Sequence, residues 1–164
     1  MEWRNIILRI SVVVTTYNGK MHLEKQLLSL LQQERAPDEV LIFDDGSTDG
    51  TIELVQSFIR KNCLESWQFY VNAKRKGWKQ NFMEGLRKAA GDILFPCDQD
   101  DIWYPKKLAE MTAVMEQQPE IKLLACDYRV LYEPGALKAT VYKKTPAETQ
   151  GLITRYGFTK HFFM

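Results

Sequence analysis

The chain has 164 residues, 45% of them hydrophobic and 26% charged, which is typical of one globular domain with a sizeable core. Lysine and arginine outnumber aspartate and glutamate by 22 to 21, so the net charge gives no argument for a nucleic-acid partner. The three cysteines form no CxxC pair, which indicates reduced thiols in a cytoplasmic protein. No signal peptide is recognisable, and no apolar stretch approaches the roughly 20 residues that a membrane span needs.

Apolar runs alternate along the chain with segments in which apolar residues recur at helical spacing. Strands are predicted at 10–14, 40–43, 68–71 and 92–95. Helices are predicted from the apolar positions at 23–31, 52–59, 82–89 and 105–115.

Two residues later in the chain mark helix boundaries, and two further strands are expected after the fourth helix. Gly91 is interpreted as a left-handed residue that stops the third helix, and Pro105 fits the first position of the fourth. Further strands are expected at 122–126 and 128–132, and beyond residue 133 the pattern predicts nothing firm.

This alternation predicts right-handed crossovers and a largely parallel sheet with helices on both faces. In open sheets of this kind, ligands bind beyond the carboxyl ends of the strands. Three polar stretches directly follow their strands and should therefore meet at one edge, namely 15–19, 44–47 and 98–101.

The acidic stretch after the fourth strand contains Asp98, Asp100 and Asp101. In extended backbone Asp98 and Asp100 would point to the same side and repel each other unless a cation lay between them. Two hard oxygen ligands suit a divalent ion that keeps waters and takes its other ligands from substrate phosphates. An acidic surface turn ahead of a helix explains these residues equally well.

The other two stretches and a basic loop offer groups suited to a nucleotide. Asp45, together with Asp44, could accept a hydrogen bond from a base N–H, or could simply cap its own turn. Thr15 offers a hydroxyl and Tyr17 a ring that could stack on a base, although packing is the commoner role of such a ring. The basic residues 74–76 suit a diphosphate, although a solvated loop is the commoner explanation.

Three stretches carry a resemblance to a known family. Residues 11–18, 42–51 and 98–103 resemble, in order and spacing, three motifs of the family 2 glycosyltransferases. The Lys76-Gly77 pair resembles part of the segment that these proteins place before the acidic motif. The resemblance runs from about residue 10 to about residue 119, and three motifs in sequence are far more specific than any one of them.

This resemblance implies a GT-A fold, which is a Rossmann-like three-layer α/β/α arrangement with a mostly parallel central sheet. It also implies a nucleotide-diphosphate sugar donor, UDP- or dTDP-linked, and Mg²⁺ or Mn²⁺ as cofactor. Carried over residue by residue, the donor-binding residues are Thr15, Tyr17, Asp44, Asp45, Lys76 and Asp98, and the metal ligands are Asp98 and Asp100. Thr15, Tyr17 and Asp45 would contact the nucleoside, and Asp100 would be the principal metal ligand.

The resemblance further implies transfer, with inversion, to a saccharide or lipid-linked acceptor in bacterial surface polysaccharide synthesis. The location would be the cytoplasm, including the inner face of the membrane. The sequence of residues 98–103 is similar to that of rhamnosyltransferase-like members of the family, and this similarity implies dTDP-rhamnose as donor. Inversion needs a carboxylate base for the acceptor hydroxyl, and no acid in 133–164 can be matched to it.

The expected organisation is therefore a single nucleotide-sugar-binding domain over 1–164, in which 120–164 begins a truncated acceptor region. A non-catalytic module that binds a nucleotide sugar remains the main alternative. A sugar nucleotidyltransferase is a lower alternative, because such enzymes carry a glycine-rich phosphate loop after the first strand and residues 15–19 contain one glycine. The sequence predicts no particular oligomeric state.

Overall fold

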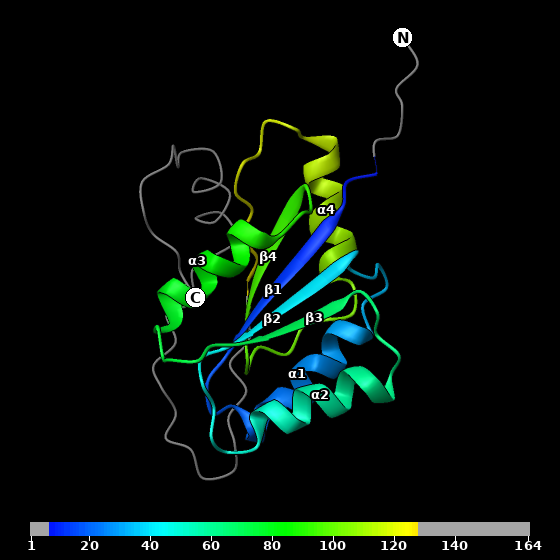
Figure 1. The fold of residues 1–164 in the computed structure, drawn as a ribbon. Helices are drawn as coiled ribbons and strands as arrows, with labels where there is room; N and C mark the ends of the chain where they lie inside the picture. Colours follow the sequence, from blue (N-terminus) through cyan, green and yellow to red (C-terminus); the bar gives the residue numbers. More distant parts are fainter. Residues whose placement is uncertain (1–6, 128–164) are drawn as a thin grey trace, which may run out of the picture. The chain divides into compact units, whose positions relative to one another are not determined.

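The computed structural model describes residues 7–127, and within them residues 7–117 form one compact unit. Its strands are β1 (Ile10–Thr16), β2 (Glu39–Asp44), β3 (Trp67–Val71) and β4 (Ile93–Asp98). Its helices are α1 (Lys20–Leu31), α2 (Thr51–Lys61), α3 (Trp78–Lys88) and α4 (Lys107–Gln117). Figure 1 shows the strands and helices alternating along the chain, each at the place that the apolar pattern predicts.

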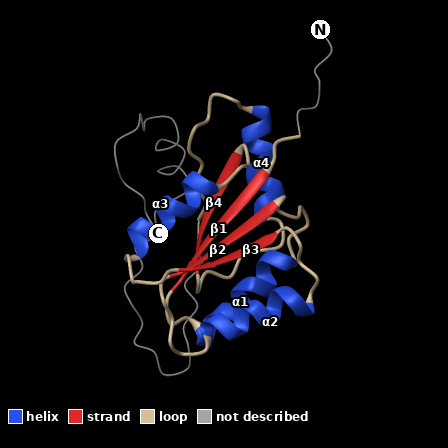
Figure 2. Ribbon diagram, in the orientation of Figure 1, coloured by secondary structure: helices blue, strands red, loops and turns tan. Residues whose placement is uncertain are grey.

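The four strands form one sheet in the order β3-β2-β1-β4, and every neighbouring pair is parallel. Helix α3 covers one face, while α1, α2 and α4 contribute side chains to the core on the other. Figure 2 shows the strands running between these helical layers. The prediction of an α/β fold with a parallel sheet covered on both faces is confirmed.

Strand β1 lies at the centre of both cores. All seven of its residues are buried, because alternate side chains point to opposite faces and both faces carry helices. Val12 and Val14 join the core beneath α1, α2 and α4, whereas Val13 joins Leu41, Phe43 and Phe82 beneath α3. Burying one such aliphatic side chain contributes about 1.5–3 kcal/mol, so the sheet is a firm platform for the loops at its carboxyl edge.

Two local predictions are wrong. Gly91 does not adopt a left-handed conformation; it is glycine because a β-carbon there would lie 2.7 Å from the backbone nitrogen of Ser11. Residues 122–126 form no strand and have no regular secondary structure, and the strand expected at 128–132 lies outside the described residues.

Within the described part of the chain, no helix is long and apolar enough to cross a bilayer.

Candidate functional site

The parallel register brings three strand ends together at the carboxyl edge of the sheet. Thr15 in β1 is level with Asp98 in β4 on one side and with Phe43 in β2 on the other. Thr16 is level with Asp44. The polar stretches that follow β1, β2 and β4 therefore start side by side, as the sequence predicts.

Asp44, expected to bind the donor, is fully buried and holds its own turn. One carboxylate oxygen accepts hydrogen bonds from the backbone N–H groups of Gly46 (3.0 Å) and Ser47 (2.7 Å). The other accepts from the hydroxyls of Thr16 (2.7 Å) and Ser47 (2.5 Å). Asp44 thereby ties the end of β1 to the turn after β2, and its oxygens already have partners within the chain.

Asp45 is 3% exposed and holds the loop between β3 and α3. Its Oδ1 accepts from the backbone N–H of Lys76 (2.7 Å) and the side-chain amide of Asn72 (3.1 Å). Its Oδ2 accepts from the N–H of Gly77 (2.8 Å) and lies 3.9 Å from Nε of Arg75. Burial raises the pKa of Asp45, but these donors and the Arg75 charge together outweigh burial and hold the pKa below its ordinary value.

Two basic side chains of this loop point to different partners. The guanidinium of Arg75 lies 3.8 Å from the ring centroid of Tyr17, a cation–π contact that connects the loop to the end of β1. The ammonium of Lys76 lies 2.6 Å from Glu84 in α3. A phosphate that bound Lys76 would therefore compete with Glu84.

The acidic stretch begins at the last residue of β4 and continues into a turn. Asp98 ends the strand, and Gln99 and Asp100 form the turn, so the extended backbone expected through Asp100 is not present. Asp98 is half-buried, whereas Asp100 and Asp101 are exposed. Burial and the negative charges of Asp101 and Asp100 raise the pKa of Asp98 to about 6.

These carboxylates fit a hard divalent cation that completes its coordination elsewhere. A cation beside Asp98 would offset the burial and the repulsion that together raise its pKa, and carboxylate oxygens are the ligands that Mg²⁺ and Mn²⁺ prefer. Among residues 7–127 no three acidic, histidine or cysteine side chains form a ready-made metal site. A bound ion would therefore take its remaining ligands from water and from a diphosphate.

The chain matches a known protein family over most of its length. The family described as glycosyl transferase family 2 matches residues 11–150, most of the chain. The chain belongs to this family. An uncharacterized glycosyltransferase of Mycoplasma pneumoniae is 31% identical over 137 residues, which are 82% of this chain and 46% of the relative.

Solved structures of two other proteins share the fold. The mannosyltransferase PcManGT of Pyrobaculum calidifontis, in complex with GDP-Man and Mn²⁺, has a TM-score of 0.61 and 28% identity over 66% of this chain and 32% of its own. TarS 1–349 of Staphylococcus aureus, in complex with UDP-GlcNAc, has a TM-score of 0.62 and 25% identity over 76% of this chain and 37% of its own. The fold is therefore the GT-A fold, and the chain spans less than half the length of these relatives.

The sequence pattern did not single out two residues whose side chains join the loops at this edge of the sheet. Asn72 donates its side-chain amide to Asp45 and to Asn81, and its position directly after β3 was the only available signal. Gln99 bonds to the backbone of Tyr17. Its place between Asp98 and Asp100 was the only signal, and an uncharged amide between two carboxylates is not a metal ligand of the kind the motif suggests.

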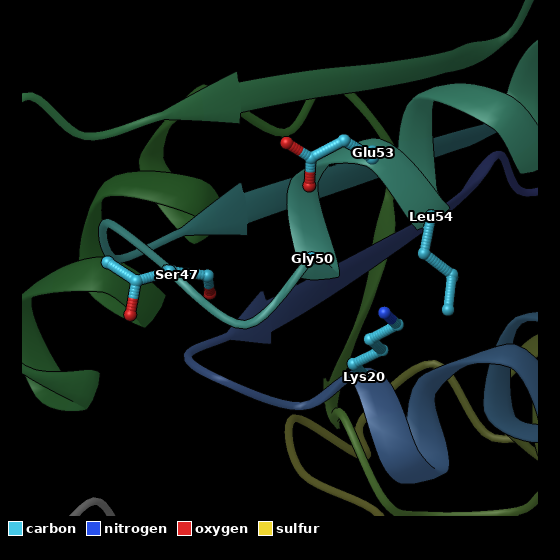
Figure 3. A pocket seen from close by; sticks show the side chains of 6 residues that line it. Lys20, Ser47, Gly50, Glu53 and Leu54 are labelled. Carbon is cyan, nitrogen blue, oxygen red and sulfur yellow. The ribbon is translucent and has the colours of Figure 1, made fainter.

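A hollow of about 450 Å³ opens beside the site, between the first turns of α1 and α2. Figure 3 shows Lys20 and Leu54 pointing into it from the two helices, with Ser47, Gly50 and Glu53 around it. None of the predicted donor-binding or metal residues lines this hollow. The predicted site is instead the open edge formed by the strand ends.

Proposed function

We propose that this chain binds a nucleotide-diphosphate sugar at the carboxyl edge of its sheet and forms the donor-binding part of a metal-dependent glycosyltransferase. The observation that carries the proposal is the register that places Thr15 beside Asp98 and Thr16 beside Asp44, in a chain that belongs to family 2. The donor is a UDP- or dTDP-linked sugar, with dTDP-rhamnose as the specific candidate from the wording of the acidic stretch.

The nucleoside would lie between the ends of β1 and β2. Tyr17 offers its ring, Thr15 its hydroxyl and Asp45 a carboxylate that can accept from a base N–H. Asp45 accepts hydrogen bonds from the backbone N–H groups of Lys76 and Gly77. The loop after β3 therefore lies next to the proposed position of the base. Asp44 acts through the turn that it holds and not by touching the ligand.

The diphosphate would lie toward β4, where Asp98 and Asp100 would hold the metal. When bound, Mg²⁺ or Mn²⁺ supplies positive charge that stabilises the leaving nucleotide diphosphate. The relative from Pyrobaculum calidifontis, solved with GDP-Man and Mn²⁺, supports this choice of ion. Lys76 is a second source of positive charge, available once it leaves Glu84.

The acceptor proposed is a saccharide or a lipid-linked sugar of bacterial surface polysaccharide synthesis, at the cytoplasmic face of the membrane. Transfer with inversion needs a general base to remove the proton of the acceptor hydroxyl as it attacks. That base is not assigned to any residue of the chain. The name of the relative TarS, a poly(ribitol-phosphate) β-N-acetylglucosaminyltransferase, supports a polymeric acceptor.

Calorimetric titration tests donor binding directly. UDP, dTDP and GDP are each titrated into the chain in Mn²⁺ and again in EDTA. We expect UDP or dTDP to bind more tightly than GDP, and tighter in Mn²⁺ than in EDTA. Equal affinity in both buffers would overturn the metal assignment, and no binding of any nucleotide would overturn the proposed function.

Donor turnover distinguishes transfer from binding alone. The chain is incubated with UDP- and dTDP-sugars in Mn²⁺, with and without an extract of lipid-linked and saccharide acceptors. Glycoside formation that needs the acceptor extract supports a transferase. Nucleotide binding without any acceptor-dependent turnover would favour the non-catalytic module.

A further inference from the structure

Gln99 bonds to both backbone groups of Tyr17. Its Oε1 accepts a hydrogen bond from the Tyr17 N–H at 2.9 Å, and its Nε2 donates to the Tyr17 carbonyl at 3.3 Å. Gln99 lies between Asp98 and Asp100 in the turn after β4, whereas Tyr17 lies directly after β1. One side-chain amide thus joins the acidic turn to the residue whose ring is proposed to receive the base.

Gly19 leaves the space that the Gln99 amide occupies. A β-carbon at Gly19 would fall 2.5 Å from Cδ of Gln99 and closer still to its Oε1, and the three nearest atoms all belong to Gln99. The backbone of Gly19 has φ −103°, which any residue can adopt, so a turn conformation does not explain this glycine. The bridge explains it, because any larger residue would push the amide away from Tyr17.

We propose that Gln99 is a positioning residue that fixes the metal-binding turn relative to the nucleoside platform at Tyr17. This inference rests on the proposed function, because it concerns a ligand that touches both places. A bound nucleoside diphosphate would contact the platform with its base, and its phosphates would lie toward the acidic turn, where Asp98 and Asp100 would hold the metal. If the two loops are held at the correct spacing before binding, less order must be created when the ligand arrives.

The quantity to measure is the metal coupling, defined as UDP affinity in Mn²⁺ divided by UDP affinity in EDTA. The bridge should matter most when the metal links the diphosphate to the acidic turn, so it should contribute to this ratio. Gln99→Ala removes both hydrogen bonds, and we expect the metal coupling to fall about tenfold. Affinity for uridine, which has no phosphates, should stay within about twofold of the wild-type value.

Gly19→Ala is an independent test of the same bridge, because it leaves Gln99 and every carboxylate in the sequence. The clash involves the end of a flexible side chain, so the chain should still fold with Gln99 displaced. We expect the same loss of metal coupling as in Gln99→Ala. The double variant should lose no more than Gln99→Ala alone, because both changes act on one contact.

Two further measurements separate positioning from a loss of stability. Asn62→Ala removes another hydrogen bond from a side-chain amide to a backbone carbonyl, that of Phe58 at 2.9 Å at the end of α2. It should lower the melting temperature without changing the metal coupling. Hydrogen exchange of the Tyr17 amide reports the bridge without any ligand, and should be slow in the wild type and fast in Gln99→Ala and Gly19→Ala.

The outcomes distinguish this inference from the proposed function on which it rests. Wild-type chain that binds UDP with strong metal coupling, beside variants that lose it, supports both. Unchanged coupling in Gln99→Ala and Gly19→Ala, with metal-dependent UDP binding intact, overturns the positioning role alone. Wild-type chain that binds no UDP or dTDP overturns the proposed function and this inference together.

Discussion

At the scale of single residues, Asp44 and Asp45 are neighbours with different surroundings. Asp44 accepts from groups inside its own turn and from Thr16, whereas Asp45 accepts from the loop after β3. Both are buried, so burial alone does not separate a structural carboxylate from a binding one. They differ in what they hold: Asp44 joins its own turn to the end of β1, whereas Asp45 joins that turn to the loop between β3 and α3.

Asp44→Ala should destabilise the domain more than it affects the ligand. The change removes a fully buried carboxylate and leaves buried backbone and hydroxyl donors without an acceptor. We expect a loss of about 3 kcal/mol in the free energy of unfolding. Urea unfolding followed by circular dichroism measures it, and wild-type stability in this variant would show that the turn does not depend on Asp44.

Asp45→Ala should mainly reduce nucleotide affinity. A lost hydrogen bond to a buried ligand group costs about 1–3 kcal/mol, so UDP or dTDP affinity should fall by roughly tenfold or more while the chain still folds. Calorimetry on the folded variant measures the affinity. If the melting temperature falls by many degrees and affinity per folded molecule is kept, Asp45 only holds the 72–77 loop.

At the scale of elements, the pattern of apolar residues predicts every strand and helix of the described unit. β1 and β2 are almost continuously apolar because helices cover both faces of the sheet. The same pattern predicts nothing about the turn after β4, where hydrogen bonds to another loop decide the backbone. The Gln99 bridge and the Gly91 contact with Ser11 both join residues more than 70 positions apart, which local patterns cannot reveal.

Residues 122–126 show that an apolar run can also predict a strand that does not form. Lys122-Leu123-Leu124-Ala125-Cys126 has the composition of a short strand, yet it forms none. A strand needs a partner for its backbone hydrogen bonds as well as a suitable composition. Composition therefore predicted a strand at a place where no neighbouring strand pairs with residues 122–126.

The end of β4 should make metal-dependent binding sensitive to pH. The pKa of Asp98 is raised to about 6 by burial and by its acidic neighbours, so protons compete with a cation for this carboxylate. We expect the metal coupling to be full above about pH 7 and to decline as the pH falls through about 6. Titrations of UDP in Mn²⁺ between pH 5 and 8 measure it, and a metal coupling that stayed constant down to pH 5 would contradict the prediction.

The raised pKa of Asp98 predicts an opposite pH dependence for folding stability in the absence of metal: stability should fall, and not rise, with increasing pH. A raised pKa means that the folded chain binds this proton more tightly than the unfolded chain does. The contribution of Asp98 to stability therefore falls as the pH rises from about 3.8 to about 6 and is constant above that. Stability in EDTA that rose across this window because of Asp98 would contradict the shift.

At the scale of the whole molecule, we propose that the described unit supplies the donor side of the reaction. The chain belongs to family 2, and its matched residues cover 46% of the Mycoplasma pneumoniae relative and 26% of TarS. The sequence motifs located the edge of the sheet, and the parallel register explains why they meet there. The specific sugar, the acceptor and the catalytic base depend on contacts that these motifs do not include.

The central claim is that a nucleotide diphosphate binds across the carboxyl ends of β1, β2 and β4. Chemical-shift mapping of ¹⁵N-labelled chain, at 19.1 kDa, with UDP and Mg²⁺ tests it most directly. We predict that the largest amide shifts fall on residues 15–19, 45–47, 72–77 and 98–101, and that EDTA reverses those at 98–101. Shifts confined to the hollow around Lys20 and Glu53, or to the far end of the sheet, would contradict the account.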